Sequence, residues 1–208
     1  MRRLPARLLA RGVTGLMHLL TGAQARWSGC GPEPAQRIYF ANHTSHGDFV
    51  LVWTCLPPDL RAKTRPVAGA DYWLMGAVRR YLITEVLNGV LIDRDRTTRT
   101  RDPIETLVEA LDQGWSLIVF PEGTRSASDE MLPFKSGIYH VARQRPAVEL
   151  VPVRIENLNR VMPKGEFLPV PLLCSATFGA PTRLQPGEHK EAFLARLRQS
   201  VIDLVVAA

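Results

Sequence analysis

The sequence predicts a single α/β domain with a mixed, mostly parallel sheet flanked by helices. Three observations support this fold class. Short apolar runs typical of strands alternate along the chain with helix-like segments. Polar residues follow two of these runs directly, at the position where strands of open α/β sheets place ligands. The length of 208 residues, with 46% hydrophobic residues, suits one domain with one sizeable core.

The first predicted element is a helix over residues 7–21 with one leucine-rich side. At about 100° per residue its apolar positions fall within about 60° of one direction: Leu9, Val13, Leu16 and Leu20. Its polar positions face the other way: Arg7, Arg11, Thr14, His18 and Thr21. This pattern is typical of a helix that lies in a membrane interface, where Arg2 and Arg3 suit anionic headgroups. The alternative is an amphipathic helix packed on the protein's own core.

The predicted strands are short and rich in β-branched and aromatic residues, and cover residues 38–41, 66–68, 90–92, 117–120, 150–155 and 175–178. Helices are predicted between several of them, over residues 49–55, 71–87, 136–143 and 190–206. The clearest helix begins at Pro103, because Asp102 can cap it, Glu105 can reach back to the cap and Gly114 can end it. The prolines of residues 163–186 predict loops around a late strand.

A polar cluster, Asn42-His43-Thr44-Ser45-His46-Gly47-Asp48, follows the strand predicted over residues 38–41. A histidine whose ring is held by a carboxylate can take a proton from a hydroxyl near neutral pH. On a continuous helix His43 and Asp48 would lie about 140° apart and out of mutual reach. The predicted bend between strand and helix allows them to meet. The alternative is that these residues are turn and cap residues and that His43 is a surface imidazole.

A second cluster, Pro121-Glu122-Gly123-Thr124-Arg125, follows the strand predicted over residues 117–120. Gly123 allows the backbone to approach a ligand closely, and Arg125 offers a planar fork for a phosphate or a carboxylate. The alternative is a solvated loop in which Glu122 pairs with Arg125.

Together these segments resemble the glycerolipid acyltransferases of the lysophosphatidate acyltransferase type. Four blocks occur in that family's order and with similar spacing, over roughly residues 37 to 155. They are residues 42–48, residues 89–94, residues 120–126 and Val151-Pro152-Val153. The resemblance implies that His43 is the general base and Asp48 its partner. It also implies acceptor or phosphate binding by Arg94, Glu122, Gly123, Thr124 and Arg125.

One position departs from the family pattern. Many relatives carry a lysine directly after a Val-Ala pair, where it is thought to contact the acceptor phosphate. Here Val67-Ala68 is followed by Gly69-Ala70-Asp71. The phosphate site therefore lacks one expected cation, for which nearby basic residues could substitute: Lys63, Arg65, Arg79 and Arg80. The identity of the acceptor stays open.

The resemblance implies transfer of a fatty acyl chain from an acyl-CoA or acyl-carrier-protein thioester to the free hydroxyl of 1-acylglycerol 3-phosphate. Alternatives are a different acceptor, such as a lysophospholipid or a lyso-aminolipid, and a lipid-binding protein without turnover. No cofactor or metal is expected, because the three cysteines lack metal-ligand spacing. We expect residues 1–28 to form an interfacial segment and residues 29–208 the acyltransferase domain.

The chain is basic, with a net charge of +6 and a pI near 9.6. Such a charge suits either an anionic membrane or a nucleic acid. No aromatic residues are interleaved with the basic clusters, and no nucleic-acid-binding module is recognisable, so we expect no nucleic-acid partner. No segment reaches the roughly 20 apolar residues of a bilayer span. We therefore expect a peripheral or monotopic protein at the cytoplasmic face of the cell membrane, bound to anionic lipids.

Overall fold

The computed structural model describes residues 4–45, 47–95, 97, 99–126, 130–158 and 173–204, apart from the side chains of Leu4 and Arg7. Its strands form one sheet in the order β1-β7-β6-β2-β5-β3-β4. The strands are β1 (Gln24–Trp27), β2 (Arg37–Ala41), β3 (Thr64–Gly69), β4 (Val90–Ile92), β5 (Ser116–Val119), β6 (Glu149–Glu156) and β7 (Ser175–Phe178).

The sheet is mixed and mostly parallel, as the sequence predicts. β2 runs parallel to β5 and β6, and β3 runs parallel to β5 and β4. Only β1 and β7 run the other way, because β7 pairs antiparallel with β6 and parallel with β1. The loops that follow β2, β3, β4 and β5 therefore leave the same edge of the sheet, where open α/β folds bind their ligands.

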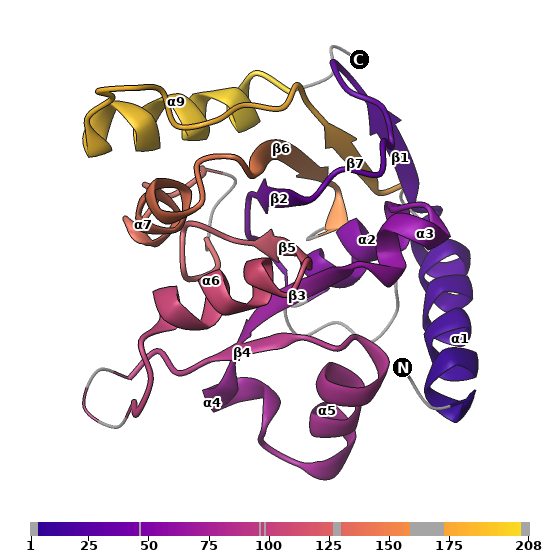
Figure 1. Cartoon of the computed structure of the whole chain (residues 1–208). Coiled ribbons are helices and arrows are strands. Elements are labelled where there is room, and N and C mark those ends of the chain that lie inside the picture. Colours follow the sequence, from indigo (N-terminus) through magenta and orange to yellow (C-terminus); the bar gives the residue numbers. More distant parts are fainter. Residues whose placement is uncertain are drawn as a thin grey trace.

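Helices cover both faces of the sheet (Figure 1). One face carries α6 (Pro103–Asp112), α7 (Gly137–Gln144) and α9 (Lys190–Ile202), and the other carries α1 (Leu4–Thr21), α2 (Asp48–Cys55), α3 (Pro58–Ala62) and the π-helix η1 (Leu82–Val86). The side chains of β2 alternate between the two cores: Ile38 and Phe40 enter the first, whereas Tyr39 and Ala41 enter the second. β2 lies in the middle of the sheet and is covered on both faces, which accounts for its uninterrupted apolar run of residues 38–41.

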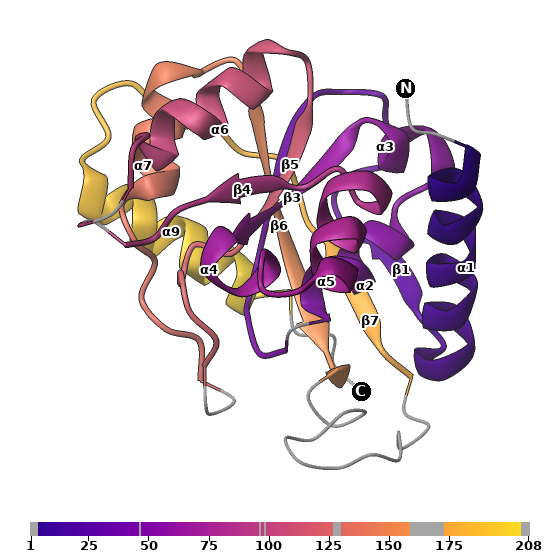
Figure 2. The same ribbon diagram turned by 90° about the horizontal axis from the view of Figure 1, so that it is seen from below.

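The helix predicted over residues 71–87 is broken, which corrects that prediction. α4 (Ala70–Trp73) and α5 (Ala77–Tyr81) are separated at Gly76, whose φ of 99° lies outside the helical region. α5 continues directly into η1, where the helix widens. Figure 2, which is seen from below, shows α4 and α5 beside β4, and Figure 1 places them at the opposite end of the molecule from α9.

Two further elements, β1 and α3, were not predicted. β1 has no apolar alternation and is largely exposed, yet it pairs with β7, and Trp27 stacks on Phe178 at 4.2 Å between ring centroids. The first strand of the sheet therefore lies inside residues 1–28, which were expected to form an interfacial segment. The predicted cap of α6 is confirmed, because the Ile104 N–H donates to the Asp102 side chain. Residues 163–171 and 205–206, over which loops and a helix end were predicted, lie outside the described residues.

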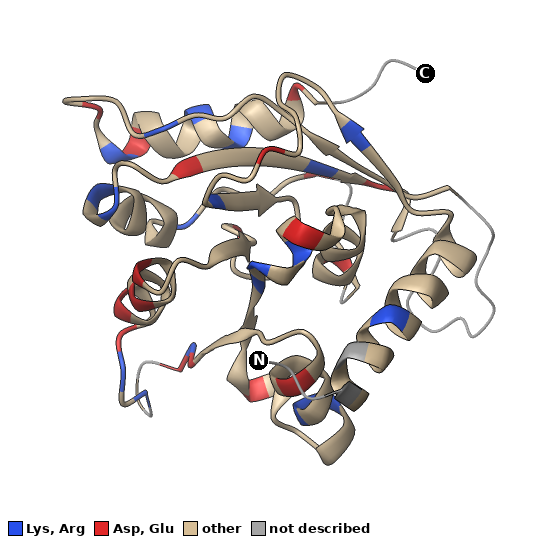
Figure 3. Cartoon of the chain, turned by 45° about the vertical axis from the view of Figure 1, so that its right-hand side comes forward, with Lys and Arg blue, Asp and Glu red and all other residues tan. Residues whose placement is uncertain are grey.

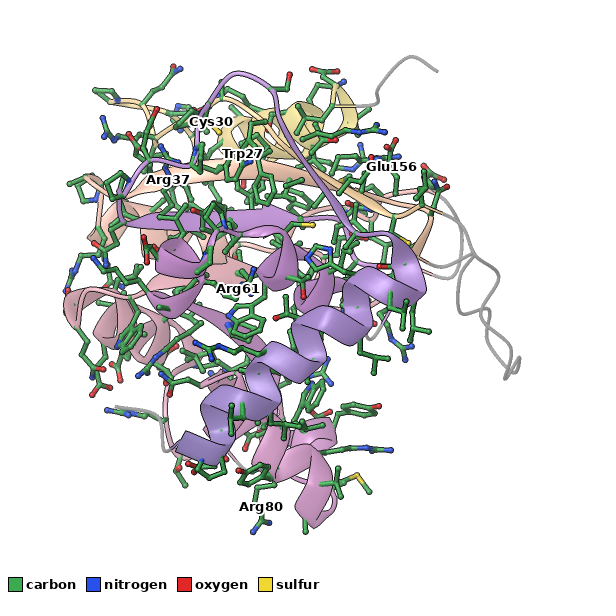
Figure 4. The ribbon with its side chains drawn as sticks, turned by 90° about the vertical axis from the view of Figure 1, so that its right-hand side faces the viewer. Trp27, Cys30, Arg37, Arg61, Arg80 and Glu156 are labelled. Atoms are coloured by element: carbon green, nitrogen blue, oxygen red, sulfur yellow. The ribbon has the colours of Figure 1, made fainter. Side chains whose placement is uncertain are left out.

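α1 packs on the protein through small residues, while the leucines whose side chains are described are exposed. Ala6, Ala10 and Thr21 are buried, whereas Leu16 and Leu19 are 54% and 81% exposed. α1 therefore does pack on the protein, as the alternative expects, but through these small residues and not through its leucines. Arg61, which lies behind α1 in Figure 4, donates to the Thr14 hydroxyl at 3.1 Å and ties α1 to α3. Among the described helices, none combines the length and hydropathy of a membrane span.

Candidate active site

The imidazole of His43 is held by the carboxylate of Asp48. His43 lies just after β2 and Asp48 is the first residue of α2, so the chain reverses between them as the predicted bend requires. The His43 Nδ1 to Asp48 Oδ2 distance is 2.8 Å. The same oxygen accepts the backbone N–H groups of Thr44 at 2.6 Å and Ser45 at 2.8 Å. These bonds fix the carboxylate, which in turn fixes the plane of the ring.

The contacts of this pair indicate that the imidazole carries a proton on Nδ1. The Asp48 side chain is fully buried, and its Oδ2 already accepts two backbone N–H groups, so Oδ2 is also the acceptor of the contact with Nδ1. With Nδ1–H donated to Asp48, the second nitrogen of His43, Nε2, is left as the acceptor. Within the described part of the chain no hydrogen bond occupies Nε2, and His43 lines a cavity. The geometry is that of a general base and its orienting group.

The second polar cluster meets the first at His43. The His43 N–H donates to Glu122 Oε1 at 2.8 Å, and the His43 carbonyl accepts from the Ser126 N–H at 2.8 Å. The imidazole also stacks on Phe120, with 4.3 Å between ring centroids and 20° between planes. Residues about eighty apart in sequence therefore form one constellation, because β2 and β5 are neighbours in the sheet.

Glu122 lies beneath this constellation. Glu122 is only 1% exposed, and its other carboxylate oxygen, Oε2, accepts the Leu132 N–H at 2.8 Å. Burial raises the pKa of Glu122, and the two backbone N–H donors act in the opposite sense. Acceptor binding was predicted for Glu122, but the structure gives it the position of a residue that holds His43. The alternative ion pair with Arg125 is also absent among the described residues, since backbone donors take both oxygens.

A cavity of about 510 Å³ opens beside His43 between the sheet and the helices α6 and α7. Four predicted binding residues line it: Arg94, Gly123, Thr124 and Arg125. Most of its wall is apolar and includes Ile38, Ile104, Leu107, Leu117, Ile138 and Val141. A charged entrance beside a long apolar wall suits an amphiphilic ligand with an anionic head.

Arg94 lines the cavity and also forms an ion pair with Asp71. Its Nη2 and Nε atoms lie 2.6 and 3.2 Å from the two Asp71 oxygens, and its Nη1 lies 3.4 Å from the Gly123 carbonyl. Hydrogen bonding to Arg94 lowers the pKa of Asp71, so the carboxylate is ionised. At Gly69, the position where the family resemblance led us to expect a lysine, a Cβ would lie within 3.0 Å of the side chains of Asp71 and Arg94. The guanidinium thus occupies space that a larger residue at position 69 would need.

Lys135 is a further cation of the cavity that was not predicted. Its aliphatic stem crosses Gly123, where a Cβ would lie 2.7 to 3.0 Å from the end of the lysine side chain. Gly123 has a φ of 69°, a backbone conformation that favours glycine. The only signal for Lys135 in the sequence is its position just before the helix of residues 136–143.

Four basic residues that could substitute for the missing lysine are not among those that line the cavity: Lys63, Arg65, Arg79 and Arg80. Arg65 lies over the Trp115 ring at 3.9 Å, and Arg79 lies over the Tyr72 ring at 4.5 Å. The cations at the cavity are instead Arg94, Arg125 and Lys135.

Among the described residues, no cysteine lines the cavity. Cys55 and Cys174 are buried, and burial raises the pKa of Cys55 to about 12, so its thiol stays protonated. Over the residues that the structure describes, no three His, Cys, Asp or Glu side chains are grouped as metal ligands would be.

Comparison with known proteins gives the same family throughout. Residues 31–156 match the Acyltransferase family. A 1-acyl-sn-glycerol-3-phosphate acyltransferase of Escherichia coli (strain K12) is 32% identical over 137 residues, covering 60% of this chain and 51% of that protein. A second, from Limnanthes alba, is 29% identical over 164 residues, covering 77% of this chain and 56% of that protein. The chain thus spans about half the length of these relatives.

The crystal structure of the 1-acyl-sn-glycerophosphate acyltransferase PlsC from Thermotoga maritima has a similar fold. Its TM-score is 0.69 at 21% identity, and the alignment covers 96% of this chain and 79% of that one. The family match extends from before β2 to the end of β6 and so includes His43, Asp48, Arg94 and residues 120–126. This chain belongs to the Acyltransferase family.

Proposed function

We propose that this protein is an O-acyltransferase that moves a fatty acyl chain from an acyl-CoA or acyl-carrier-protein thioester to the free hydroxyl of 1-acylglycerol 3-phosphate, giving phosphatidate. The observation that carries the proposal is the 2.8 Å contact between His43 Nδ1 and Asp48 at the wall of a cavity with a cationic entrance. The two named relatives, both 1-acyl-sn-glycerol-3-phosphate acyltransferases, support this choice of acceptor.

In this mechanism His43 Nε2 takes the proton of the acceptor hydroxyl as its oxygen attacks the thioester carbonyl. Asp48 stabilises the imidazolium that forms, because its buried charge faces Nδ1. The tetrahedral intermediate then collapses: the new ester C–O bond remains, the C–S bond breaks, and the thiolate takes the proton from His43. No covalent intermediate with the enzyme is needed.

The cations and the apolar wall of the cavity suit different parts of the two substrates. We assign the acceptor phosphate to the cations Arg94, Arg125 and Lys135, since guanidinium and ammonium groups are phosphate ligands. We assign the transferred acyl chain to the apolar wall between the sheet and the helices α6 and α7. This arrangement brings the hydroxyl and the thioester together beside His43, and such positioning supplies a large share of the rate.

A mass-spectrometric acceptor screen tests the proposed function. Purified protein is incubated with one labelled acyl thioester and a panel of lysolipids that includes 1-acylglycerol 3-phosphate. The expected products are labelled phosphatidate and an equal amount of free thiol. Transfer to no member of the panel, or thiol release that does not depend on any acceptor, would contradict the proposal and would favour a lipid-binding protein without turnover.

We expect replacement of Arg94 by glutamine to raise the acceptor KM about tenfold while leaving kcat within about twofold, because a phosphate contact that is distant from the reacting atoms contributes uniform binding. The measurement is a steady-state titration of 1-acylglycerol 3-phosphate. Arg101→Gln is the matched control, since Arg101 is an exposed arginine that pairs with Glu109 and does not line the cavity. Equal KM values for the two variants would contradict the assignment.

We infer that α1 attaches the protein to an anionic membrane surface through its exposed leucines. Deletion of residues 1–25 would also remove part of β1, so point substitutions are preferable. Leu16→Ser with Leu19→Ser should weaken binding to phosphatidylglycerol vesicles about tenfold or more, since both side chains are available to enter the interface. His18→Gln, on the same helix but outside the leucine side, is the control. Vesicle co-sedimentation equal to wild type would refute this role.

A second acceptor class is favoured by one observation. Asp71 places a negative charge against Arg94 at the position where many relatives supply a lysine from position 69. A zwitterionic lysolipid would find both an anion and a cation there, whereas a phosphate monoester meets a partly neutralised site. The acceptor screen separates these cases, because a lysophospholipid or lyso-aminolipid would then outcompete 1-acylglycerol 3-phosphate.

A further inference from the structure

An exposed apolar and basic surface lies at the α4–α5 break. We define the α5 surface as Leu74, Met75, Val78, Arg79, Arg80 and Tyr81. Residues 74–81 are all exposed, with Met75 at 68% and Val78 at 73%. The surface spans the end of α4 and the start of α5, whose N-cap Gly76 has a φ of 99°. Exposed apolar side chains gathered on one short segment indicate a contact surface.

The charge of the α5 surface favours an anionic partner. Residues 74–81 contain two arginines and no acidic residue. Arg80 lies at the lower edge of the molecule in Figure 4, with its side chain directed away from the body. Elsewhere basic and acidic residues are interspersed along the ribbon (Figure 3). Apolar side chains beside arginines match the acyl boundary and the headgroups of an anionic bilayer.

The α5 surface is continuous with the cavity of the active site. Met75 belongs to this surface and also lines the cavity, together with Tyr72 and Trp73. Trp73 in turn packs edge-on against Phe49, with ring centroids 5.2 Å apart. An acyl chain that leaves a bilayer at Met75 therefore meets apolar side chains on its way to His43, so its transfer needs no passage through water.

α1 and the α5 surface are neighbours. α1 packs on η1, the helix that directly continues α5. In Figure 4 the N-terminal end of α1 lies close to α5. Both elements therefore offer apolar side chains from the same part of the molecule, although they come from segments some sixty residues apart.

We propose that the α5 surface is a second membrane-docking element, which rests on an anionic bilayer and delivers the lysolipid to the cavity at Met75. Its role in substrate entry rests on the proposed function, whereas the docking itself does not. Entry beside Met75 places the lipid head between the membrane and the cations of the cavity, with its chain directed toward the apolar wall. Docking therefore sets how fast a membrane-embedded acceptor reaches His43.

The test uses the full chain with α1 intact. Val78→Ser with Tyr81→Ser removes two exposed apolar side chains that do not line the cavity. We expect binding to mixed phosphatidylcholine and phosphatidylglycerol vesicles, measured without substrate, to weaken at least about tenfold. Acyl transfer to a vesicle-embedded acceptor should fall in parallel, whereas transfer to a short-chain acceptor dissolved as monomers should stay within about twofold of wild type.

Arginine substitutions provide the matched charge control. Arg80→Gln should weaken vesicle binding about fivefold, as one basic residue near an anionic surface predicts, and Arg143→Gln on α7 should not. Unchanged vesicle binding by the Val78/Tyr81 double variant would overturn the proposal. A wild-type dimer that this variant dissociates would also overturn it, since the partner would then be a second copy. Lack of acyl transfer by the wild type would refute the proposed function, whereas the vesicle-binding measurement would still test the docking proposal.

Discussion

Replacement of His43 by alanine is expected to lower the rate of acyl transfer by about 10²- to 10⁴-fold while the protein stays folded. Only His43 places a ring nitrogen at the cavity wall with its other nitrogen held by a buried carboxylate in the described structure. Without this base the hydroxyl proton has no acceptor as the oxygen attacks. The measurement is the initial rate of labelled phosphatidate formation at saturating substrates, with folding checked by circular dichroism.

His140→Ala is the matched control, because His140 is an exposed histidine on α7 with no hydrogen bond to a carboxylate among the described residues. It should retain wild-type activity. The His43→Ala variant loses the stack on Phe120, and aromatic contacts of this kind are worth about 1 kcal/mol, which a stable domain tolerates. A folded His43→Ala protein with more than about a tenth of the wild-type rate would rule out His43 as the base.

Replacement of Glu122 by alanine is expected to destabilise the protein by roughly 2 to 5 kcal/mol and to abolish most activity. Glu122 accepts the N–H groups of His43 and Leu132, and its removal would leave both donors without their acceptor in a buried site. Each unsatisfied buried donor costs about 1–3 kcal/mol. The free energy of unfolding in urea, measured alongside acyl transfer, tests both parts of the expectation.

Two variants sharpen this test. Glu122→Gln keeps a side-chain acceptor for one of the two donors and should therefore lie between wild type and Glu122→Ala in stability. Glu105→Ala removes an exposed glutamate from α6 and should change the free energy of unfolding by less than about 0.5 kcal/mol. If Glu122→Ala were as stable as Glu105→Ala, the carboxylate would not be the link between His43 and the loop of Leu132.

The sequence predicted the elements that carry strong periodicity or caps. β2, β5 and α6 lie where their apolar patterns and the Asp102 cap place them. β1 was not predictable in this way, because its stability comes from pairing with β7, about 150 residues later in the chain. The break at Gly76 also escaped prediction, since the surrounding residues are good helix formers and only the positive φ distinguishes that glycine.

In the candidate site, too, local sequence patterns were predictable and contacts between distant segments were not. His43 and Asp48 could be paired from sequence because a bend was predictable between strand and helix. Glu122 was expected in the acceptor site, because residue order does not reveal that its carboxylate turns inward to two backbone donors. Lys135 was missed because its position over Gly123 depends on how the loop after β5 folds back before α7.

The most direct test of the account is a double-mutant cycle of acyl-transfer rates over His43→Ala and Asp48→Asn. Asp48→Asn alone should slow the reaction about 10²-fold or more, because the imidazolium loses the charge that stabilises it. The account predicts that the double variant is no slower than His43→Ala, since Asp48 acts on the reaction only through that ring. Losses that multiply, with the double variant slower by the product of the single effects, would contradict it.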